Sequence, residues 1–427
     1  MSYVINIDPF YAPDGSQYNI EITIPDGGYS VEESHHLTEF DTFQIGSSNY
    51  NEVIFYPSNF KFTFTVTVDN DRFDKWLLIY KLLTSNETTV NIQKDGVDYF
   101  WGNVYPRGIT GNKDSYEIGL TVIDPITELK YVDNKTDFPG IPVGDSDVMH
   151  FRSIILELIQ AVHPKFTSES QILSYCQYQF ESEHTFLGVP WVGNWSDMGI
   201  YNSRIFGSNS PYNDALDALK SILLAFGCYG VFGLGNKFYV IPFFFSSAAN
   251  QVNLLSLRKD QEPFVSPKIR GLRLKVFTGT VGSYQDYDYG EYEIIQASRH
   301  EDDSGDYYEF YHDIPAGDLP VSGAFNNLLI YVPDYVVGLG LGHWDLMRHN
   351  YCRLNSVSAW KSLYRVTGDA YWDLVSRNRY GHILKTPQTV EPYNTVKVYN
   401  SSDIYRVKLI EKSIENDNKV KIIECGI

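Results

Sequence analysis

The 427-residue sequence has little cysteine, a shortage of basic residues and no long apolar run. Its four cysteines, Cys176, Cys228, Cys352 and Cys425, are far apart and form no CxxC pair. This spacing supports neither a metal site nor a redox motif, and we expect free thiols. No stretch approaches the roughly 20 apolar residues of a membrane-spanning helix. The first residues lack the basic start and apolar run of a signal peptide, so we expect synthesis and folding in a cytoplasm.

The charge balance argues against two classes of function. The chain has 53 acidic and 34 basic residues, which gives a formal net charge of −19. Unaided binding of nucleic acid and docking on anionic lipid both need clustered Lys and Arg, so neither is expected. A negative surface suits a soluble protein, or a wall along which DNA can slide without being bound.

Length and aromatic content indicate several β-rich domains. A chain of this length exceeds one ordinary core, and its 33 Tyr and 25 Phe favour β-structure. We predict a mainly β chain with an α+β middle section, barrel-like domains and a few short helices. The predicted domains are residues 1–130, a barrel-like domain with one helix; 131–265, an α+β domain; and 266–427, a β-rich domain.

The first domain has the clearest periodicity. Residues 59–70, NFKFTFTVTVDN, alternate apolar and polar side chains, which predicts a half-buried antiparallel strand. A helix should follow, capped by Asp69 or Asn70, because apolar side chains then recur at helical spacing at Phe73, Trp76, Leu77 and Tyr80. Further strands are predicted at 88–93, 97–105 and 116–123, the first two joined by a tight Asp95-Gly96 turn.

The middle section predicts two helices and a hairpin. Apolar stripes indicate a helix over 151–162, ended by Pro164, and another over 214–226, capped by Asn213 and ended by Gly227. The segment between them is predicted to be a loop to about Pro211. Two short strands should flank Gly235-Asn236. In the last third we predict a strand at 272–276, helical patches at 344–353 and 358–364, and a terminal hairpin of 404–414 with 419–425.

No group of residues predicts catalysis, a cofactor or a metal. His35 and His36 lie near Glu32 and Glu33, but neighbours in a strand face opposite ways, so a surface pair is the simpler interpretation. Residues 299–306 lack the ligand spacing of an EF-hand and indicate a solvated acidic turn. Residues 338–343, GLGLGH, lack the βαβ context of a dinucleotide loop. No carboxylate pair stands out for glycoside hydrolysis, so we do not expect an enzyme.

Three consecutive aromatic residues, Tyr99, Phe100 and Trp101, raise the question of what covers their strand. Successive side chains point to opposite faces, so both faces must meet protein. We expect Phe100 on one face and Tyr99 with Trp101 on the other, and we take Tyr99 and Trp101 as a candidate interface between subunits. The alternative is a strand that a single subunit buries on both faces.

Four segments of the first domain follow one another in the order NFKFTFTVTVDN, a short helix, TTVNIQKDGVDYFWGNVYPRG and YEIGLTVIDPITELK. This order resembles tail hub or baseplate proteins of tailed bacteriophages that infect Bacteroidetes, and the likeness covers about residues 55–245. The matching residues are Asp95, Gly96, Phe100, Trp101, Gly102, Pro106, Asp124, Leu129 and Lys130. The sequence departs from the family at Asp124-Pro125, where Asp-Gly is more usual.

The resemblance implies a structural virion protein of the tail, which closes the tail tube and connects it to the tip during host attachment and genome delivery. It implies a homo-oligomer, a trimer or else a hexameric ring, that contacts tail tube and tail tip proteins and meets DNA only as passing cargo. The protein would be made in the host bacterial cytoplasm. An alternative function is a glycan-binding module or glycan hydrolase of the tail, which would use the aromatic loops around Trp191, Trp195 and Tyr201.

Overall fold

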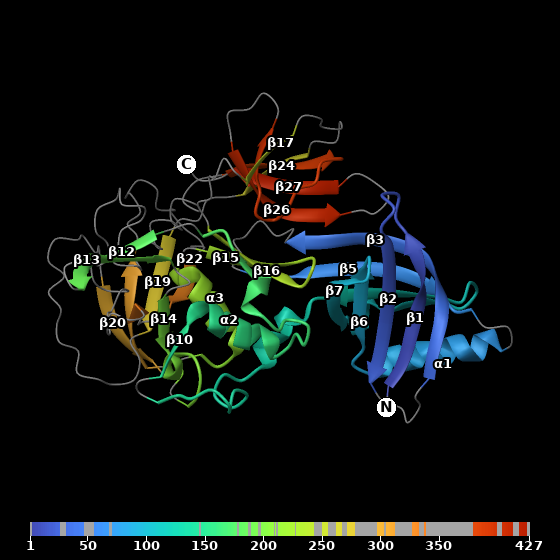
Figure 1. The fold of residues 1–427 in the computed structure, drawn as a ribbon, viewed down its shortest axis with the longest axis horizontal. Coiled ribbons are helices and arrows are strands. Elements are labelled where there is room, and N and C mark those ends of the chain that lie inside the picture. The colour runs from blue at the N-terminus through green and yellow to red at the C-terminus, as the bar shows by residue number, and fades with distance from the viewer. Residues whose placement is uncertain are drawn as a thin grey trace, which may run out of the picture.

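The chain is mainly β and contains a closed barrel, a helix–hairpin region and a C-terminal sheet (Figure 1). The structure is a computed structural model that describes residues 2–25, 31–46, 55–67, 71–144, 147–176, 179–186, 189–194, 198–208, 210, 212–226, 228–242, 250–254, 262–266, 271–277, 297–302, 305–311, 327–332, 337–338, 379–398, 404–412 and 418–424. The predicted class, mainly β with barrel-like structure and a few short helices, is confirmed.

Seven strands from the first 123 residues close into the barrel. They are β1 (Ser2–Tyr11), β2 (Gln17–Pro25), β3 (Val31–Gly46), β5 (Ser58–Thr65), β6 (Thr89–Lys94), β7 (Val97–Val104) and β9 (Glu117–Ile123). Their order is β1-β2-β6-β7-β9-β5-β3, and β3 returns to β1 in a parallel pair. The short strand β8 (Thr110–Asn112) adds to β9.

The alternating strand predicted over 59–70 fills the barrel interior. Phe60, Phe62 and Phe64 of β5 are at most 2% exposed. They lie opposite Val122, Leu120 and Ile118 of β9 in an antiparallel register. The polar residues between them point outward, as the period-two pattern requires. The barrel interior is therefore a packed core, as is usual for barrels of this size.

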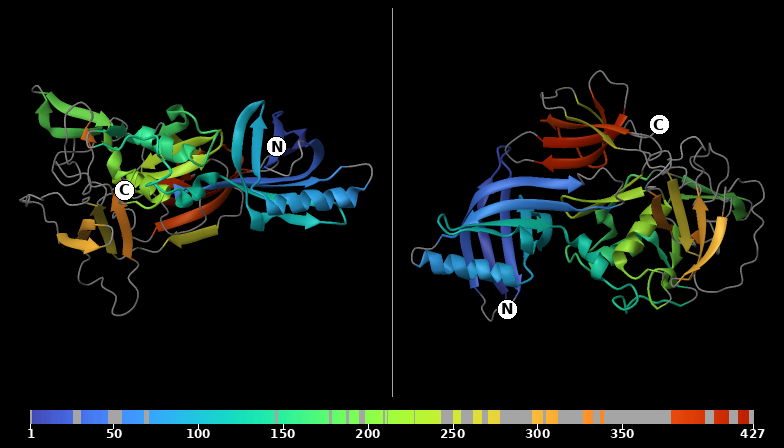
Figure 2. Two further views of the ribbon diagram at one scale, coloured as in Figure 1. Left: turned by 90° about the horizontal axis from the view of Figure 1, so that it is seen from below. Right: turned by 180° about the vertical axis from the view of Figure 1, so that it is seen from behind.

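The predicted first helix is present as α1 (Arg72–Ser85), which lies along the barrel (Figure 2). Its buried residues are Trp76, Ile79 and Leu83, whereas Phe73 is 47% exposed, so the predicted apolar face is wrong at Phe73. The Trp76 indole fixes this rotation because its Nε1 donates to the Glu117 carbonyl at 3.1 Å. Asp71 occupies the N-cap position, and Asp69 and Asn70 lie outside the described residues.

The helix–hairpin region contains the elements predicted for the middle section. It comprises η2 (Pro125–Tyr131), α2 (Phe151–Gln160), β11 (Ile172–Ser174), α3 (Ala215–Ala225), β15 (Cys228–Gly233) and β16 (Lys237–Pro242). The predicted cap of the second helix is wrong, because Asp214 and not Asn213 accepts the backbone N–H of Asp217, at 2.9 Å. Gly227 lies outside the described residues.

The loop predicted before Pro211 is wrong in part, because its described residues contain β11 and, after it, three longer strands. They are β12 (Gln179–Phe186), β13 (Val189–Asn194) and β14 (Met198–Tyr201), and β14 pairs with β10 (Val148–His150) and β23 (Val337–Gly338). β12 and β13 form an antiparallel hairpin. Pairing with a neighbouring strand provides hydrogen-bond partners for the backbone N–H and C=O groups of these segments. Their sequences alternate only weakly between apolar and polar residues, so the strands were not predicted. Three short helical turns are η1 (Pro106–Gly108), η3 (Glu169–Gln171) and η5 (Asn202–Arg204).

The final third is β-structure in its described parts. The C-terminal sheet comprises β17 (Gln251–Leu254), β18 (Glu262–Ser266), β24 (Arg379–Thr386), β25 (Thr395–Val398), β26 (Ile404–Lys412) and β27 (Asn418–Glu424). A separate sheet contains β19 (Gly271–Phe277), β20 (Ala297–Asp302), β21 (Gly305–Tyr311) and β22 (Asn327–Val332). The predicted strand at 272–276 and the terminal hairpin are confirmed. The helical patches predicted at 344–353 and 358–364 lie outside the described residues.

Strands from the N-terminal third join all three parts. The end of β3 pairs with β26, next to the red strands in Figure 1, and β4 (Phe55–Tyr56) pairs with β15. One apolar core fills the barrel, and a second is shared by the helix–hairpin region and the C-terminal sheet. Ile126 and Leu129 of η2 belong to the second core. The domain boundaries at 130 and 265 stay a prediction.

Candidate functional site on the aromatic strand

The hairpin that carries the aromatic run has the predicted turn and an unexpected bulge. Asp95 and Gly96 have φ of 52° and 78°, the left-handed pair that a two-residue hairpin turn favours. Further along, Ile92 lies opposite Phe100, but Gln93 lies opposite Asp98, so Tyr99 is an extra residue on β7. A β-bulge of this kind breaks the alternation of side chains between the two faces.

Because of the bulge, Tyr99 and Phe100 both pack with the barrel core. The Tyr99 ring lies 5.3 Å from the Phe43 ring, and the Phe100 ring lies 5.9 Å from it, between centroids. Phe100 is 1% exposed, and Tyr99 is partly buried against the same cluster. The prediction that Tyr99 shares a face with Trp101 is therefore wrong.

Trp101 faces away from the barrel interior and is covered by the helix–hairpin region. It is 9% exposed, and its ring lies 4.9 Å from the ring of His163, which is fully buried. The backbone N–H of His163 donates to the Ile159 carbonyl at 2.9 Å, and this bond holds His163 on the turn after α2. Both side chains of the predicted interface thus have partners in their own chain, and an inter-subunit role for Tyr99 and Trp101 stays a prediction.

His163 lies among aromatic rings. The Phe232 ring lies 4.9 Å away and the Phe166 ring 6.2 Å away, between centroids. Neither ring nitrogen of His163 has a hydrogen-bond partner within the described part of the chain. Desolvation lowers the pKa of His163 to about 4, so the imidazole is neutral at physiological pH.

Two polar contacts accompany the Trp101–His163 pair, and together the three form what we call the β7 junction. The Lys165 Nζ lies 3.2 Å from the Asp98 Oδ2, and the Gly235 N–H donates to the Tyr99 carbonyl at 2.6 Å. Burial acts to raise the pKa of Asp98, but hydrogen bonds from Gln93 and Asn91 outweigh it and the pKa is lowered. The β7 junction therefore holds the barrel to the helix–hairpin region by one aromatic contact, one ion pair and one backbone hydrogen bond.

A second link lies where the chain leaves the barrel. The buried Asp124 carboxylate accepts hydrogen bonds from the Ser58 N–H, from the Ser58 hydroxyl at 3.2 Å and from the Ile126 N–H at 3.1 Å. Desolvation nevertheless raises the pKa of Asp124 to about 7. Asp124 caps η2, and Pro125 occupies the first helical position, where no N–H is needed. The Asp-Pro departure from the family pattern is therefore compatible with a capped turn.

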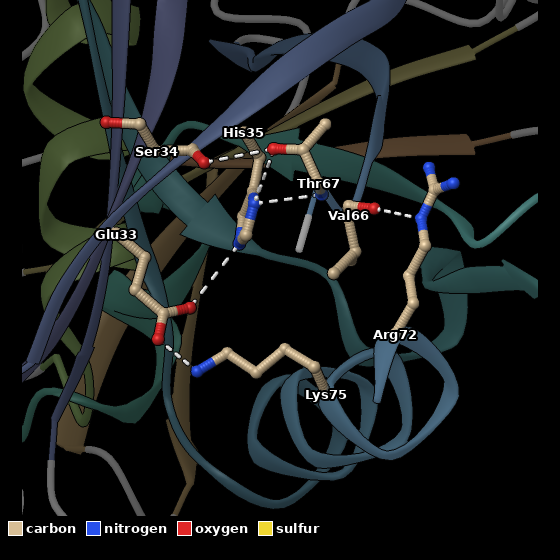
Figure 3. A network of polar contacts seen from close by, with 7 residues as sticks. All are labelled: Glu33, Ser34, His35, Val66, Thr67, Arg72 and Lys75. Atoms are coloured by element: carbon tan, nitrogen blue, oxygen red, sulfur yellow. Dashed lines mark hydrogen bonds and ion pairs between the residues drawn. The ribbon is translucent and has the colours of Figure 1, made fainter. Parts of the chain in front are cut away.

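The predicted surface pair of histidines is wrong for His35, which is 1% exposed. Figure 3 shows that Glu33 lies between the Lys75 ammonium, which it contacts, and the His35 Nε2, at 3.5 Å. The backbone N–H of Thr67 donates to the His35 Nδ1 at 3.3 Å, so the proton of the neutral ring lies on Nε2. Burial lowers the pKa of His35. This network fastens β3 to α1 and to the chain after β5.

His36 points the other way and contacts Asp8, as strand geometry predicts for neighbours. Among the described residues, no cluster of His, Cys, Asp and Glu could hold a metal ion. Cys176 and Cys228 are buried and free, whereas Cys352 and Cys425 lie outside the described residues. No helix in the described ranges is both long and apolar enough to cross a membrane.

The remaining sequence motifs have mixed outcomes. Asp302 and Gly305 close the β20–β21 hairpin, in agreement with a turn in the acidic segment. Residues 339–343 of the glycine-rich motif lie outside the described residues. Trp191 lies in β13 and Tyr201 in β14, and Trp195 lies outside the described residues.

Sequence reasoning missed a hollow of about 260 Å³ on the outer face of β1, β2 and β6, with both polar and apolar lining residues. It is lined by Asn6, Ile7, Pro9, Asn19, Ile20, Glu21, Asn91 and Gln93. The strand register places Asn6 opposite Glu21 and Glu21 opposite Asn91. Amides both donate and accept hydrogen bonds, so this surface offers contacts to a neutral hydroxyl-rich molecule. The recurrence of Asn and Gln at alternate positions of neighbouring strands was the available signal.

Comparisons with known proteins gave likenesses of structure only. No family model matches the chain, and no curated protein matches its sequence. The chain is similar to the 43 kDa tail protein of prophage MuSo2 from Shewanella oneidensis, with a TM-score of 0.43, 8% identity and coverage of 95% of this chain and 98% of that one. It is also similar to a tail protein from Neisseria meningitidis MC58, with a TM-score of 0.43, 9% identity and coverage of 95% of this chain and 96% of that one. A third similar structure is the p2 virion baseplate in its activated conformation, with a TM-score of 0.30, 10% identity and coverage of 100% of this chain and 99% of that one.

Proposed function

We propose that the chain is a structural component of a phage tail, a hub or baseplate protein that closes the tail tube and connects it to the tip. The observation that carries the proposal is the order of the matching segments between residues 59 and 130. These segments fold as β5, α1, β6, β7 with η1, and β9 with η2. The strands and α1 belong to the barrel and η2 leads out of it, so the matches are contiguous in the fold and not scattered.

Continuity between the three parts of the chain supports a mechanical role. β3 belongs to the barrel and also pairs with β26 of the C-terminal sheet. β4 pairs with β15, and Leu234 packs against both apolar cores. A protein that transmits attachment forces needs such direct connections, because parts joined only by linkers move independently.

The relation to DNA follows from the barrel. Its interior is filled by aromatic side chains, so a passage for DNA would lie between copies of the chain. The first 60 residues, which form β1, β2, β3 and the start of β5, contain nine acidic residues and neither Lys nor Arg. A passage lined by these strands would repel phosphates and let DNA slide. DNA is on this proposal cargo and not a ligand.

The proposal includes assembly into a homo-oligomer, with a trimer favoured and a hexameric ring as the alternative. Its partners would be tail tube and tail tip proteins, its location the virion tail, and its host a member of the Bacteroidetes. Native mass spectrometry and negative-stain imaging of the purified full chain test this directly. We expect a closed oligomer with a central opening. A compact monomer at micromolar concentration would contradict the proposal.

The hollow on the outer face of β1, β2 and β6 favours a second candidate function, binding of a glycan. Its polar side chains are four amides and one carboxylate, and its lining contains no basic group that would select an anion. A glycan array and an assay for reducing-sugar release test this candidate, with Glu21→Ala as the matched variant. Glycan binding that disappears in the variant would favour a binding module, whereas a hub should bind no glycan through this surface.

A further inference from the structure

His163 differs from His35, the other histidine that is buried among the described residues, because neither of its ring nitrogens has a hydrogen-bond partner there. His35 accepts a hydrogen bond from the Thr67 N–H and lies 3.5 Å from Glu33. His163 is 0% exposed, and both of its ring nitrogens lack hydrogen bonds within the described ranges. A buried polar group without a partner is costly, and native proteins retain few of them. A Phe side chain could make the same ring contacts at position 163 without burying a polar group. The histidine therefore adds a titratable group that packing alone does not require.

The charged groups beside His163 offer no site for a second positive charge. Lys165 follows on the same segment and bears a charge that opposes protonation of the ring. Asp98, on the facing strand β7, is occupied by Lys165 and by the side-chain amides of Asn91 and Gln93. β15 contributes Phe232, which is apolar. A protonated His163 therefore has no charged acceptor, and because burial outweighs the support from its own backbone, protonation favours movement of the ring toward water.

We propose that His163 is an acid-sensitive contact, which holds the barrel to the helix–hairpin region when neutral and releases it when protonated. Movement of the ring removes the cover of Trp101, the one large aromatic side chain that β7 presents to the helix–hairpin region. The Gly235–Tyr99 backbone hydrogen bond, which belongs to the same junction, then becomes exposed to exchange with solvent. The inference concerns the chain itself and does not rest on a role in a phage tail.

The direction of the pH effect follows from desolvation. Burial lowers the pKa of His163 from 6.5 to about 4. A base whose pKa is lower in the folded state binds fewer protons there than in the unfolded chain. The β7 junction should therefore be intact above pH 6.5 and weaken progressively as the pH falls from 6.5 to about 4.

Hydrogen–deuterium exchange of the full-length protein between pH 7 and pH 4, corrected for the intrinsic rate, tests the proposal. We expect protection of the peptides that contain Gly235 and β7 to fall at least tenfold in the wild type. His163→Phe should keep its protection within twofold, and His36→Asn, a change at an exposed histidine, should behave as the wild type does. Loss of protection at the same pH in His163→Phe and in the wild type would overturn the proposal.

A second measurement keeps the test valid if His163→Phe does not fold. The emission of Trp101, taken as the wild-type spectrum minus that of Trp101→Phe, should change over the same pH range as the exchange. His163→Met, which retains a side chain of similar volume, should remove that change. A difference spectrum that is independent of pH in the wild type would overturn the proposal.

Discussion

Replacing Trp101 by Ala tests whether the aromatic strand is covered by its own chain. Trp101 is 9% exposed and rests against His163, so truncation leaves a void at the β7 junction and uncovers the ring of His163. Tyr99 and Phe100 are untouched, because they pack into the barrel core. The damage should therefore be centred on the contact between the barrel and the helix–hairpin region.

The expected loss follows from the buried area. A Trp side chain buries about 200 Å², and at about 25 cal/mol per Å² its nearly complete removal from water is worth about 5 kcal/mol. Truncations of buried aromatic residues usually cost about 3–5 kcal/mol, which includes partial collapse of the cavity. We therefore expect Trp101→Ala to lower the free energy of unfolding by about 3–5 kcal/mol.

Urea unfolding followed by circular dichroism, combined with sedimentation velocity, measures the effect. Tyr105→Ala is a suitable control, because Tyr105 follows the same strand but is 42% exposed, and its loss should change stability by no more than about 0.5 kcal/mol. If Trp101→Ala unfolds like the wild type but sediments as a smaller particle, Trp101 is an anchor between subunits and our reasoning is refuted.

Three further changes test other parts of the structure. Leu219→Asp places an unpaired carboxylate at a position of α3 that is 0% exposed and should cost several kcal/mol in a thermal melt; an unchanged melt would remove α3 from the core. Since the pKa of Asp124 rises from 3.8 to about 7 on folding, the free energy of unfolding should fall by up to about 4 kcal/mol between pH 4 and pH 7, and Asp124→Asn should lose this slope in urea titrations. An equal slope in both proteins would contradict the burial of an ionisable Asp124. Gly102→Ala brings a Cβ to 2.5 Å from the Ile123 carbonyl and should lower the melting temperature by several degrees, whereas Gly15→Ala, which meets no atom, bears only the strain of its positive φ.

The barrel was the most predictable part of the fold, because its signals are local. The alternation around Phe60, Phe62 and Phe64 specifies which face is buried, and Asp95-Gly96 specifies a tight hairpin. Closure of the barrel was not predictable in detail, because it depends on the parallel return of β3 to β1 between segments that are distant in the chain. Pairing of β3 with β26 is still more distant and leaves no local signal.

The strand that carries the candidate site was predicted, but the face on which each of its aromatic side chains lies was not. Counting alternate residues assigns Tyr99 and Trp101 to one face, and a single bulge residue reverses that assignment for Tyr99. The partner of Trp101 was also hidden, because His163 lies about 60 positions away on the turn after a helix, and nothing in its neighbours singles it out. Burial of His35 was missed because Thr67, whose N–H donates to its ring, lies 32 positions away in the chain, and Lys75, which pairs with Glu33 beside the ring, belongs to α1.

Five of the residues that carry the family resemblance have a structural task in this chain. Asp95 and Gly96 make the turn, Phe100 fills the barrel, and Trp101 contacts the helix–hairpin region. Gly102 permits the close approach of β7 to the Ile123 carbonyl. A motif composed of such residues specifies a folded unit rather than a chemical site. If Trp101 is covered within its own chain, as its contact with His163 indicates, we expect copies of the chain to recognise each other through surfaces outside these five residues, and mutations that separate assembly from stability should be sought on the outward residues of the barrel.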